Sequence, residues 1–155
     1  HVEIIDQLKG IKLCDRKVII PLNYGIKRYG DFVEEYASDK LNDNVQALRE
    51  FLTFDKYQKI VQSCSIVIMP HLRQQAAGNI VQALYTGAKV YLYKYSTLYK
   101  YLIDVGLKVY NIDDGIDLAP ITEDIIIHNK KYVVDSFGKE KQHKRINELV
   151  NIINS

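Results

Sequence analysis

Residues 65–93 read SIVIMPHLRQQAAGNIVQALYTGAKVYLY. An apolar, β-branched run at 65–69 ends at Pro70, and a second apolar run at 89–93 follows Gly87, where a helix-ending glycine is expected. Between them, apolar residues recur at helical spacing: Ala77, Ile80, Val81 and Leu84. This order of strand, helix and strand predicts two parallel strands joined by a crossover helix.

The same alternation extends through most of the chain. Short apolar runs predict strands at 18–20, 45–49, 65–69, 89–93 and 108–112. Residues suited to helix N-caps stand between them: Asp31, Asp55, and Ser96 or Thr97. Further helices are expected from about 120–124 and, beyond a basic linker at 138–145, at 146–153. We therefore predict an α/β fold, doubly wound around a mainly parallel, Rossmann-like sheet.

Composition narrows the class of protein. The chain has 155 residues, 47% hydrophobic and 26% charged, with a net charge of +2. We expect one domain over 1–155, because a chain of this length buries a sizeable core. The balanced charge argues against a nucleic-acid partner, and the apolar runs are too short to span a membrane. The first residue is His1 rather than Met, so we expect a fragment of a longer protein.

Cysteine and histidine spacing gives no sign of a metal site. Cys14 and Cys64 form no CxxC pair, and the histidines lack metal-ligand spacing. Because two distant cysteines form no disulfide framework, we expect reduced thiols in a cytoplasmic protein. The acids Asp113, Asp114 and Asp117 are open to two interpretations, a metal or ribose contact and a solvated acidic turn. The basic residues of 139–145 could contact an anionic membrane or form a solvated linker.

Ligands of parallel sheets bind at the carboxyl ends of the strands. The loops that follow such ends here are 23–29, 52–55 and 71–79. In the last loop, a helix N-terminus suits an anion, and Gly78 lets a ligand approach the backbone closely. Arg73 could grip a phosphate, and Gln74 and Gln75 could bind sugar hydroxyls. The alternative is that these side chains are solvated and that Gly78 packs the helix against the sheet.

Three segments together resemble one family. They are IPLNY at 20–24, LTFDKY at 52–57 and HLRQQAAGN at 71–79, followed by Gly87 and Val90. In this order they resemble the bacterial 4-acetamido-4,6-dideoxygalactose (Fuc4NAc) transferases, also called the 4-alpha-L-fucosyltransferase family. The resemblance covers roughly residues 17–114. Members of this family transfer a sugar from a dTDP donor to a lipid-linked acceptor.

The resemblance implies that this chain is the C-terminal, donor-binding half of a two-domain GT-B glycosyltransferase. It implies donor contacts from Asn23, Gly25, Phe54, His71, Arg73, Gln74, Gln75, Gly78 and Asn79. Within this set, Arg73 would contact the diphosphate, Asn23 and Gly25 the phosphate side of the cleft, and Phe54 the nucleobase region. No metal or other cofactor is implied.

The acceptor, a lipid-linked glycan, would bind the missing N-terminal domain, which would also supply any catalytic base. The fragment alone would then bind donor without transferring sugar. The implied location is the cytoplasm, including peripheral contact with the inner face of the cytoplasmic membrane. Related retaining GT-B enzymes carry two glutamates eight residues apart, and Gln74 and Gln82 stand at the corresponding positions here. This departure favours hydrogen bonding over charge in donor recognition.

Two other functions fit the same pattern. One is a non-catalytic, doubly wound regulatory or ligand-binding module. The sequence argues against a receiver domain, because Asn23, Tyr24, Pro70 and His71 stand where its acidic residues should be. The other is one half of a sugar-nucleotide epimerase, which product analysis would distinguish from a transferase.

Overall fold

A computed structural model describes residues 1–72 and 77–138, with residues 141, 143 and 147. The chain divides into two compact units, the first from His1 to Tyr57 and the second from Gln58 onward. Each unit contains short parallel strands with helices packed on them. The predicted α/β class is confirmed, and a strand occurs at each of the five predicted places.

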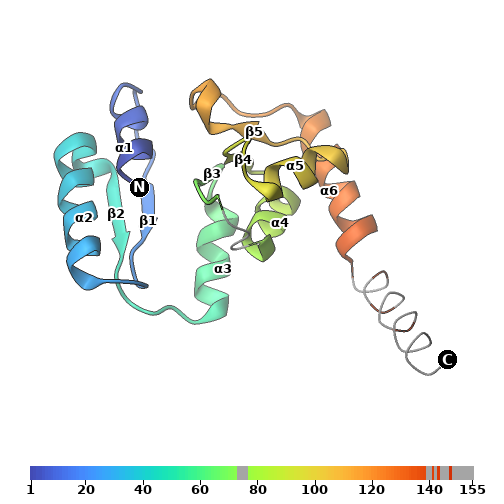
Figure 1. Cartoon of the computed structure of the whole chain (residues 1–155), viewed down its shortest axis with the longest axis horizontal. Helices are drawn as coiled ribbons and strands as arrows, with labels where there is room; N and C mark the ends of the chain where they lie inside the picture. Colours follow the sequence, from blue (N-terminus) through green and yellow to red (C-terminus); the bar gives the residue numbers. More distant parts are fainter. Residues whose placement is uncertain (73–76, 139–140, 142, 144–146, 148–155) are drawn as a thin grey trace. The chain divides into compact units, whose positions relative to one another are not determined.

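The first unit contains a two-stranded sheet. Its elements are α1 (Val2–Lys9), β1 (Val18–Pro21), α2 (Lys27–Leu41), the short 3-10 helix η1 (Asn42–Asn44) and β2 (Val45–Leu48). The strands pair in parallel, from Val18 opposite Val45 to Pro21 opposite Leu48. Helix α2 packs against α1 and lies alongside β2 (Figure 1). The core of this unit includes Ile4, Ile5, Leu8, Ile20, Val33, Ala37 and Leu41.

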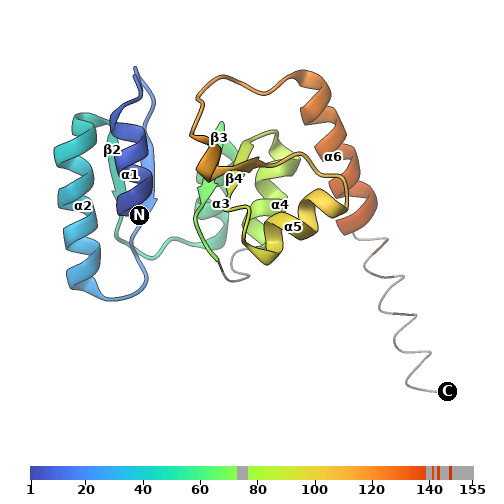
Figure 2. The same ribbon diagram turned by 45° about the horizontal axis from the view of Figure 1, so that its top comes forward.

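Helix α3 (Phe54–Ser63) crosses the boundary and leads into the second unit. The elements that follow are β3 (Ile66–Met69), α4 (Ala77–Thr86), β4 (Lys89–Leu92), α5 (Thr97–Asp104), β5 (Tyr110–Asn111), the 3-10 helix η2 (Ile112–Asp114) and α6 (Glu123–Phe137). The strand order is β3-β4-β5, and both pairings are parallel. Helix α4 contacts β4 on one side and α6 on the other (Figure 2).

Strand β4 is the centre of the second unit, and all four of its residues are buried. Because side chains alternate along a strand, Val90 and Leu92 share one face, and Lys89 and Tyr91 share the other. Burial of one aliphatic side chain of this size contributes about 1.5–3 kcal/mol. The apolar face of β4 and the buried residues of α4 (Ile80, Ala83 and Leu84) therefore anchor this unit.

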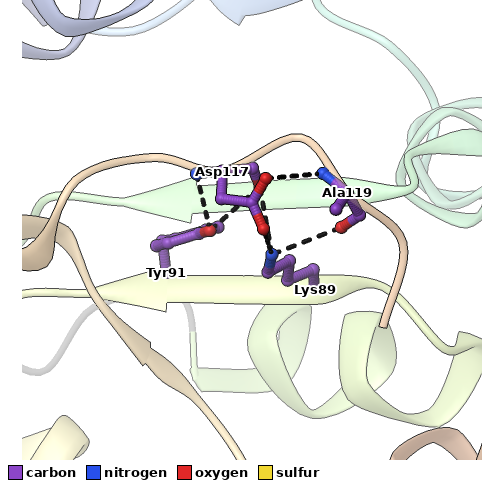
Figure 3. Close-up of polar contacts among 4 residues, drawn as sticks. All are labelled: Lys89, Tyr91, Asp117 and Ala119. Atoms are coloured by element: carbon purple, nitrogen blue, oxygen red, sulfur yellow. Dashed lines mark hydrogen bonds and ion pairs between the residues drawn. The ribbon is translucent and has the colours of Figure 1, made fainter. Parts of the chain in front are cut away.

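The opposite face of β4 carries a buried lysine (Figure 3). The ammonium of Lys89 donates to the Asp117 carboxylate at 2.8 Å, to the Asp117 carbonyl at 3.1 Å and to the Ala119 carbonyl at 3.2 Å. The Tyr91 hydroxyl donates to the Asp117 carbonyl and accepts from the Asp117 amide. The Lys89 nitrogen also lies 4.9 Å from the centre of the Tyr110 ring. All three lysine donors are therefore satisfied.

These contacts fix the loop after η2 to the amino end of the sheet, because Lys89 is the first residue of β4. Burial lowers the pKa of Lys89, but the hydrogen bond to Asp117 and the neighbouring Tyr91 outweigh it. The net result is a pKa above the ordinary value of 10.5. The lysine therefore stays charged at neutral pH and holds the loop.

Several helix boundaries differ from the sequence-based expectation. Helix α2 begins at Lys27, so the predicted N-cap at Asp31 is wrong; Asp31 instead pairs with Lys27 one turn earlier, at 2.8 Å. Helix α3 begins at Phe54, which places Asp55 in the first turn rather than at the cap. Ser96 is confirmed as an N-cap, because its hydroxyl accepts from the Tyr99 amide at 3.1 Å.

The two ends of the chain also differ from the expectation or lie beyond it. Helix α1 was not predicted, although Ile4, Ile5 and Leu8 have the spacing of a buried helical face. The expected basic linker and terminal helix, beyond residue 138, lie almost wholly outside the described residues. Among the described residues, no helix combines the length and the apolar character that crossing a membrane requires.

Replacing Lys89 by Met should lower the free energy of unfolding by about 1–3 kcal/mol at pH 7, because the Asp117 carboxylate and the Asp117 and Ala119 carbonyls lose the ammonium donor. The effect should stay below that of a fully buried ion pair, since the Asp117 side chain is 68% exposed. Because the folded pKa of Lys89 is raised, the difference from the wild type is fully present below pH 10.5 and shrinks as the pH rises through the folded pKa.

Urea unfolding near pH 7 and near pH 11 measures this difference. Lys59→Met is the matched control, because Lys59 is exposed on α3 and its loss should leave stability unchanged. Equal stability of the Lys89 and Lys59 variants at pH 7 would contradict the structural role of Lys89.

Candidate functional site

The carboxyl ends of β3, β4 and β5 lie at one edge of the sheet in the second unit, because all three strands are parallel. Strand β3 ends at Met69, and His71 follows two residues later. Helix α4 begins at Ala77, so its first turn contains Gly78 and Asn79. The predicted site residues His71, Gly78 and Asn79 therefore belong to the segments that join β3 to α4.

Gly78 is exposed, and a Cβ built on it would meet no described atom within 4 Å. The alternative reading, in which this glycine packs the helix against the sheet, is therefore wrong for the described residues. Open space at Gly78 leaves the backbone accessible at the point where helix amides lack intrahelical partners. Those amides and the positive end of the helix dipole favour an anion.

His71 is the described polar side chain of the loop after β3. Its Nδ1 atom is buried and makes no hydrogen bond within the described part of the chain. A buried polar atom without a partner is destabilising, so a bound ligand or water at this nitrogen would be favourable. His71 is therefore the described side chain with the clearest unmet bonding capacity in the loop after β3.

Arg73, Gln74 and Gln75 carry much of the sequence-based hypothesis, and they lie outside the described residues. Their contacts to a diphosphate and to sugar hydroxyls therefore stay predictions. Gln82, the second position of the glutamine pair, lies on α4 and is half-buried.

Asn111 organises the ends of β4 and β5. Its buried side-chain oxygen accepts from the Lys94 amide at 3.1 Å and from the Asp113 amide at 3.3 Å, and its nitrogen donates to Asp114 at 2.9 Å. Asp114 thus takes part in a local turn, while Asp117 binds Lys89 at the other end of the sheet. Across the described residues, no group of three or more His, Cys, Asp or Glu side chains could hold a metal.

The first unit presents a second group of predicted residues. Asn23 and Gly25 follow the carboxyl end of β1, and Gly25 has a φ of +91°, which favours glycine. The Leu22 amide donates to the Leu48 carbonyl at 2.9 Å, so this loop starts from a fixed point on β2. Phe54, the first residue of α3, is 71% exposed and available to a ligand.

Arg49, just after β2, belongs to this edge and was not predicted. Its Nε donates to Glu34 at 2.7 Å, and its Nη2 donates to Asp31, which Lys27 also contacts. The Lys27 hydrogen bond, aided by Arg49, lowers the pKa of Asp31. The signal that could have found Arg49 is its position, because it directly follows a strand end. Its bonds to Glu34 and Asp31 hold the end of β2 against helix α2.

Comparison with known proteins identifies one family. The family model described as 4-alpha-L-fucosyltransferase, glycosyl transferase group 56, matches residues 1–137. The match runs from the first residue to the end of α6 and includes every site residue named above. No solved structure shows a significant match to the chain.

Two glycine variants test whether Gly78 is kept for space rather than for folding. Gly78→Ala should leave the free energy of unfolding unchanged or raise it by up to about 1 kcal/mol, because alanine is the better helix former. Gly87→Ala should lower it by about 1–3 kcal/mol, because φ is +90° there and a Cβ would meet Ile126. Urea unfolding measures both, and equal destabilisation would show that Gly78 is structural.

Proposed function

Because the chain belongs to the 4-alpha-L-fucosyltransferase family of glycosyltransferases, we propose that it is the donor-binding half of such an enzyme. The donor is a nucleoside diphosphate sugar, dTDP-linked and carrying a deoxyamino sugar. The acceptor is a lipid-linked glycan or another glycan of the cell envelope. Family membership shows that the reaction is glycosyl transfer. The identities of the donor and of the acceptor are what we propose.

One observation supports the position of the diphosphate. The start of α4 offers helix amides beside the open Gly78, and it follows the loop in which the Nδ1 atom of His71 has no hydrogen-bond partner among the described residues. A diphosphate placed there receives backbone hydrogen bonds and a favourable helix dipole. Arg73, next in the same loop, adds a charge-assisted contact in this proposal.

This arrangement suggests how the chain would assist transfer. When the glycosidic bond breaks, negative charge grows on the departing nucleoside diphosphate. Donors that are already oriented toward that charge stabilise the transition state more than the ground state. The α4 amides, His71 and Arg73 would have this role, while Gln74 and Gln75 would bind the sugar or phosphate through hydrogen bonds. Asn23 and Gly25, in the loop after β1, remain proposed as further donor contacts.

The proposal assigns three further properties to the protein. Donor binding needs no metal, because helix amides and Arg73 supply the positive potential. The acceptor and any catalytic base belong to a separate N-terminal domain, so this chain alone binds donor without transferring sugar. The enzyme works in the cytoplasm, in peripheral contact with the inner face of the membrane that holds its acceptor.

Calorimetric titration with dTDP, UDP and GDP tests the donor site. We expect saturable binding of one nucleotide per chain, with dTDP tightest. Arg73→Ala should weaken it by about tenfold or more, because a hydrogen bond to a charged group contributes roughly 1.5–3 kcal/mol. Gly78→Ala should also weaken it, since a methyl group would stand where the phosphate approaches. Lys59→Met is the control, and equal affinity of all variants would contradict the site.

Repeating the dTDP titration with excess EDTA, and again with Mg²⁺, tests metal independence. Because the proposed phosphate ligands are amides and Arg73, the dissociation constant should agree within about twofold in the two buffers. Loss of binding in EDTA that Mg²⁺ restores would show that a metal bridges the diphosphate. That result would transfer the role of the α4 amides to metal ligands.

A further inference from the structure

The exposed side of helix α2 carries a row of three aromatic side chains. The ring centres of Tyr29 and Phe32 lie 6.5 Å apart, and those of Phe32 and Tyr36 lie 5.8 Å apart. Tyr29 is 47% exposed and Phe32 is 49% exposed, while Tyr36 is half-buried. Their spacing of i, i+3 and i+7 is that of the seam along which two helices pair. We call these three residues the aromatic seam, and its exposure indicates a surface that binds a partner.

Helix α1 covers one flank of the aromatic seam and leaves the other flank open. Helix α1 lies beside α2 (Figure 1), and the Tyr36 hydroxyl donates to the Asp6 carboxylate at 2.6 Å. Arg28 and Glu35 each directly precede a tyrosine of the seam, so both lie on the same side of it. Both residues are exposed. They therefore mark the open flank, from which a partner can approach.

Most of the charged groups of α2 are already paired within the first unit. These pairs join Lys27 to Asp31, Lys40 to Asp39, and Arg49 to Asp31 and Glu34. Arg28 and Glu35 differ, because neither forms an ion pair or a hydrogen bond with another described residue. Within the described part of the chain, α2 therefore offers a partner one free cation and one free anion, seven residues apart.

Helix α1 adds charges of both signs to the same surface. Glu3 and Lys9 are exposed, and Asp6 is exposed but bonded to Tyr36. Lys40 lowers the pKa of Asp39, and Lys9 is near enough to add to this effect. Cations and anions are thus interspersed over both helices. This distribution argues against an anionic membrane as the partner, because such a membrane attracts a cluster of cations.

A second copy of α2 is the partner that the free charges fit. When two copies lie antiparallel about a two-fold axis at the midpoint of residues 28–35, each Arg28 faces Glu35 of the second copy. Each charge then lies about 5 Å along the helix from that midpoint, given the rise per residue of an α-helix. Phe32 lies beside the midpoint, so the two Phe32 rings meet near the axis. Parallel pairing would instead place Arg28 opposite Arg28.

We propose that the aromatic seam is a homodimer interface, in which two copies of α2 pair antiparallel and form two ion pairs between Arg28 and Glu35. Burial of the rings of Tyr29 and Phe32 supplies the affinity, and the ion pairs select the partner and its direction. The dimer is weak, because one helix from each copy gives a small interface. This inference concerns the first unit alone and does not depend on the proposed function.

Sedimentation velocity of the chain over a wide range of concentrations tests the dimer, and we expect a dissociation constant in the micromolar range. Arg28→Glu and Glu35→Arg should each weaken the dimer by about tenfold or more, because each substitution places like charges opposite one another at two symmetric positions. An equimolar mixture of these two variants should dimerise as well as the wild type, because every pair across the interface again joins opposite charges.

Phe32→Ala should also weaken the dimer by about tenfold, because the ring surface at the axis is lost. Two variants of the second unit are matched controls and should leave the dissociation constant unchanged. Lys59→Glu reverses an exposed charge on α3, and Tyr101→Ala removes a ring of α5 that is 48% exposed. Urea unfolding of every variant should show a midpoint close to that of the wild type, because the substituted side chains lie at the surface.

Four results would overturn the inference. The wild type could stay monomeric up to millimolar concentration. It could dimerise while the charge reversals leave the dimer intact, which would place the interface elsewhere. The mixture of the two reversed variants could fail to dimerise, which would exclude antiparallel pairing of Arg28 with Glu35. Finally, a monomeric wild type could bind vesicles of anionic phospholipid and lose this binding in Phe32→Ala, which would make the aromatic seam a membrane contact.

Discussion

Parallel pairing on both sides of β4 is the constraint on which the second unit depends. Every residue of this strand is buried, so both of its edges must pair with other strands and both of its faces must be covered by other residues. The register places Ile66 of β3 opposite Lys89 and Tyr110 of β5 opposite Tyr91. Parallel pairing then gives the sheet two unlike edges, one where strands begin and one where they end.

The two edges differ in how their polar groups are satisfied. At the amino edge, Lys89 and Tyr91 bond to Asp117 and Ala119, and this closed set of contacts holds a loop in place. At the carboxyl edge, the helix start at Gly78 is open and the Nδ1 atom of His71 is buried without a partner in the described residues. The contacts that hold the loop and the proposed ligand site therefore lie at opposite ends of the same strands. In the first unit, the exposed aromatic rings of Tyr24 and Phe51 likewise follow the carboxyl ends of β1 and β2.

Sequence reasoning predicted the strands well because each is a short apolar run bounded by turn residues. It misplaced the start of α2 because Asp31 looks like a cap, while its carboxylate is used by Lys27 and by Arg49, which is distant in sequence. The Lys89 contacts were missed for a similar reason, since the partner Asp117 is 28 residues away. Of the site, the position of Gly78 and His71 beside a strand end could be predicted. The contact between the exposed rings of Tyr24 and Phe51, whose centres lie 5.3 Å apart, could not, because exposure and ring contact depend on how two loops meet in space.

The central claim of the proposal is that the start of α4, at the carboxyl edge of the β3-β4-β5 sheet, binds the diphosphate of the donor nucleotide. Hydrogen exchange followed by mass spectrometry, with and without saturating dTDP, tests it without any substitution. The proposal predicts slower exchange in peptides covering 70–80, and no change in peptides covering 87–91 and 115–119 at the amino edge. Protection confined to the amino edge, or saturable binding with no protection at 70–80, would contradict it.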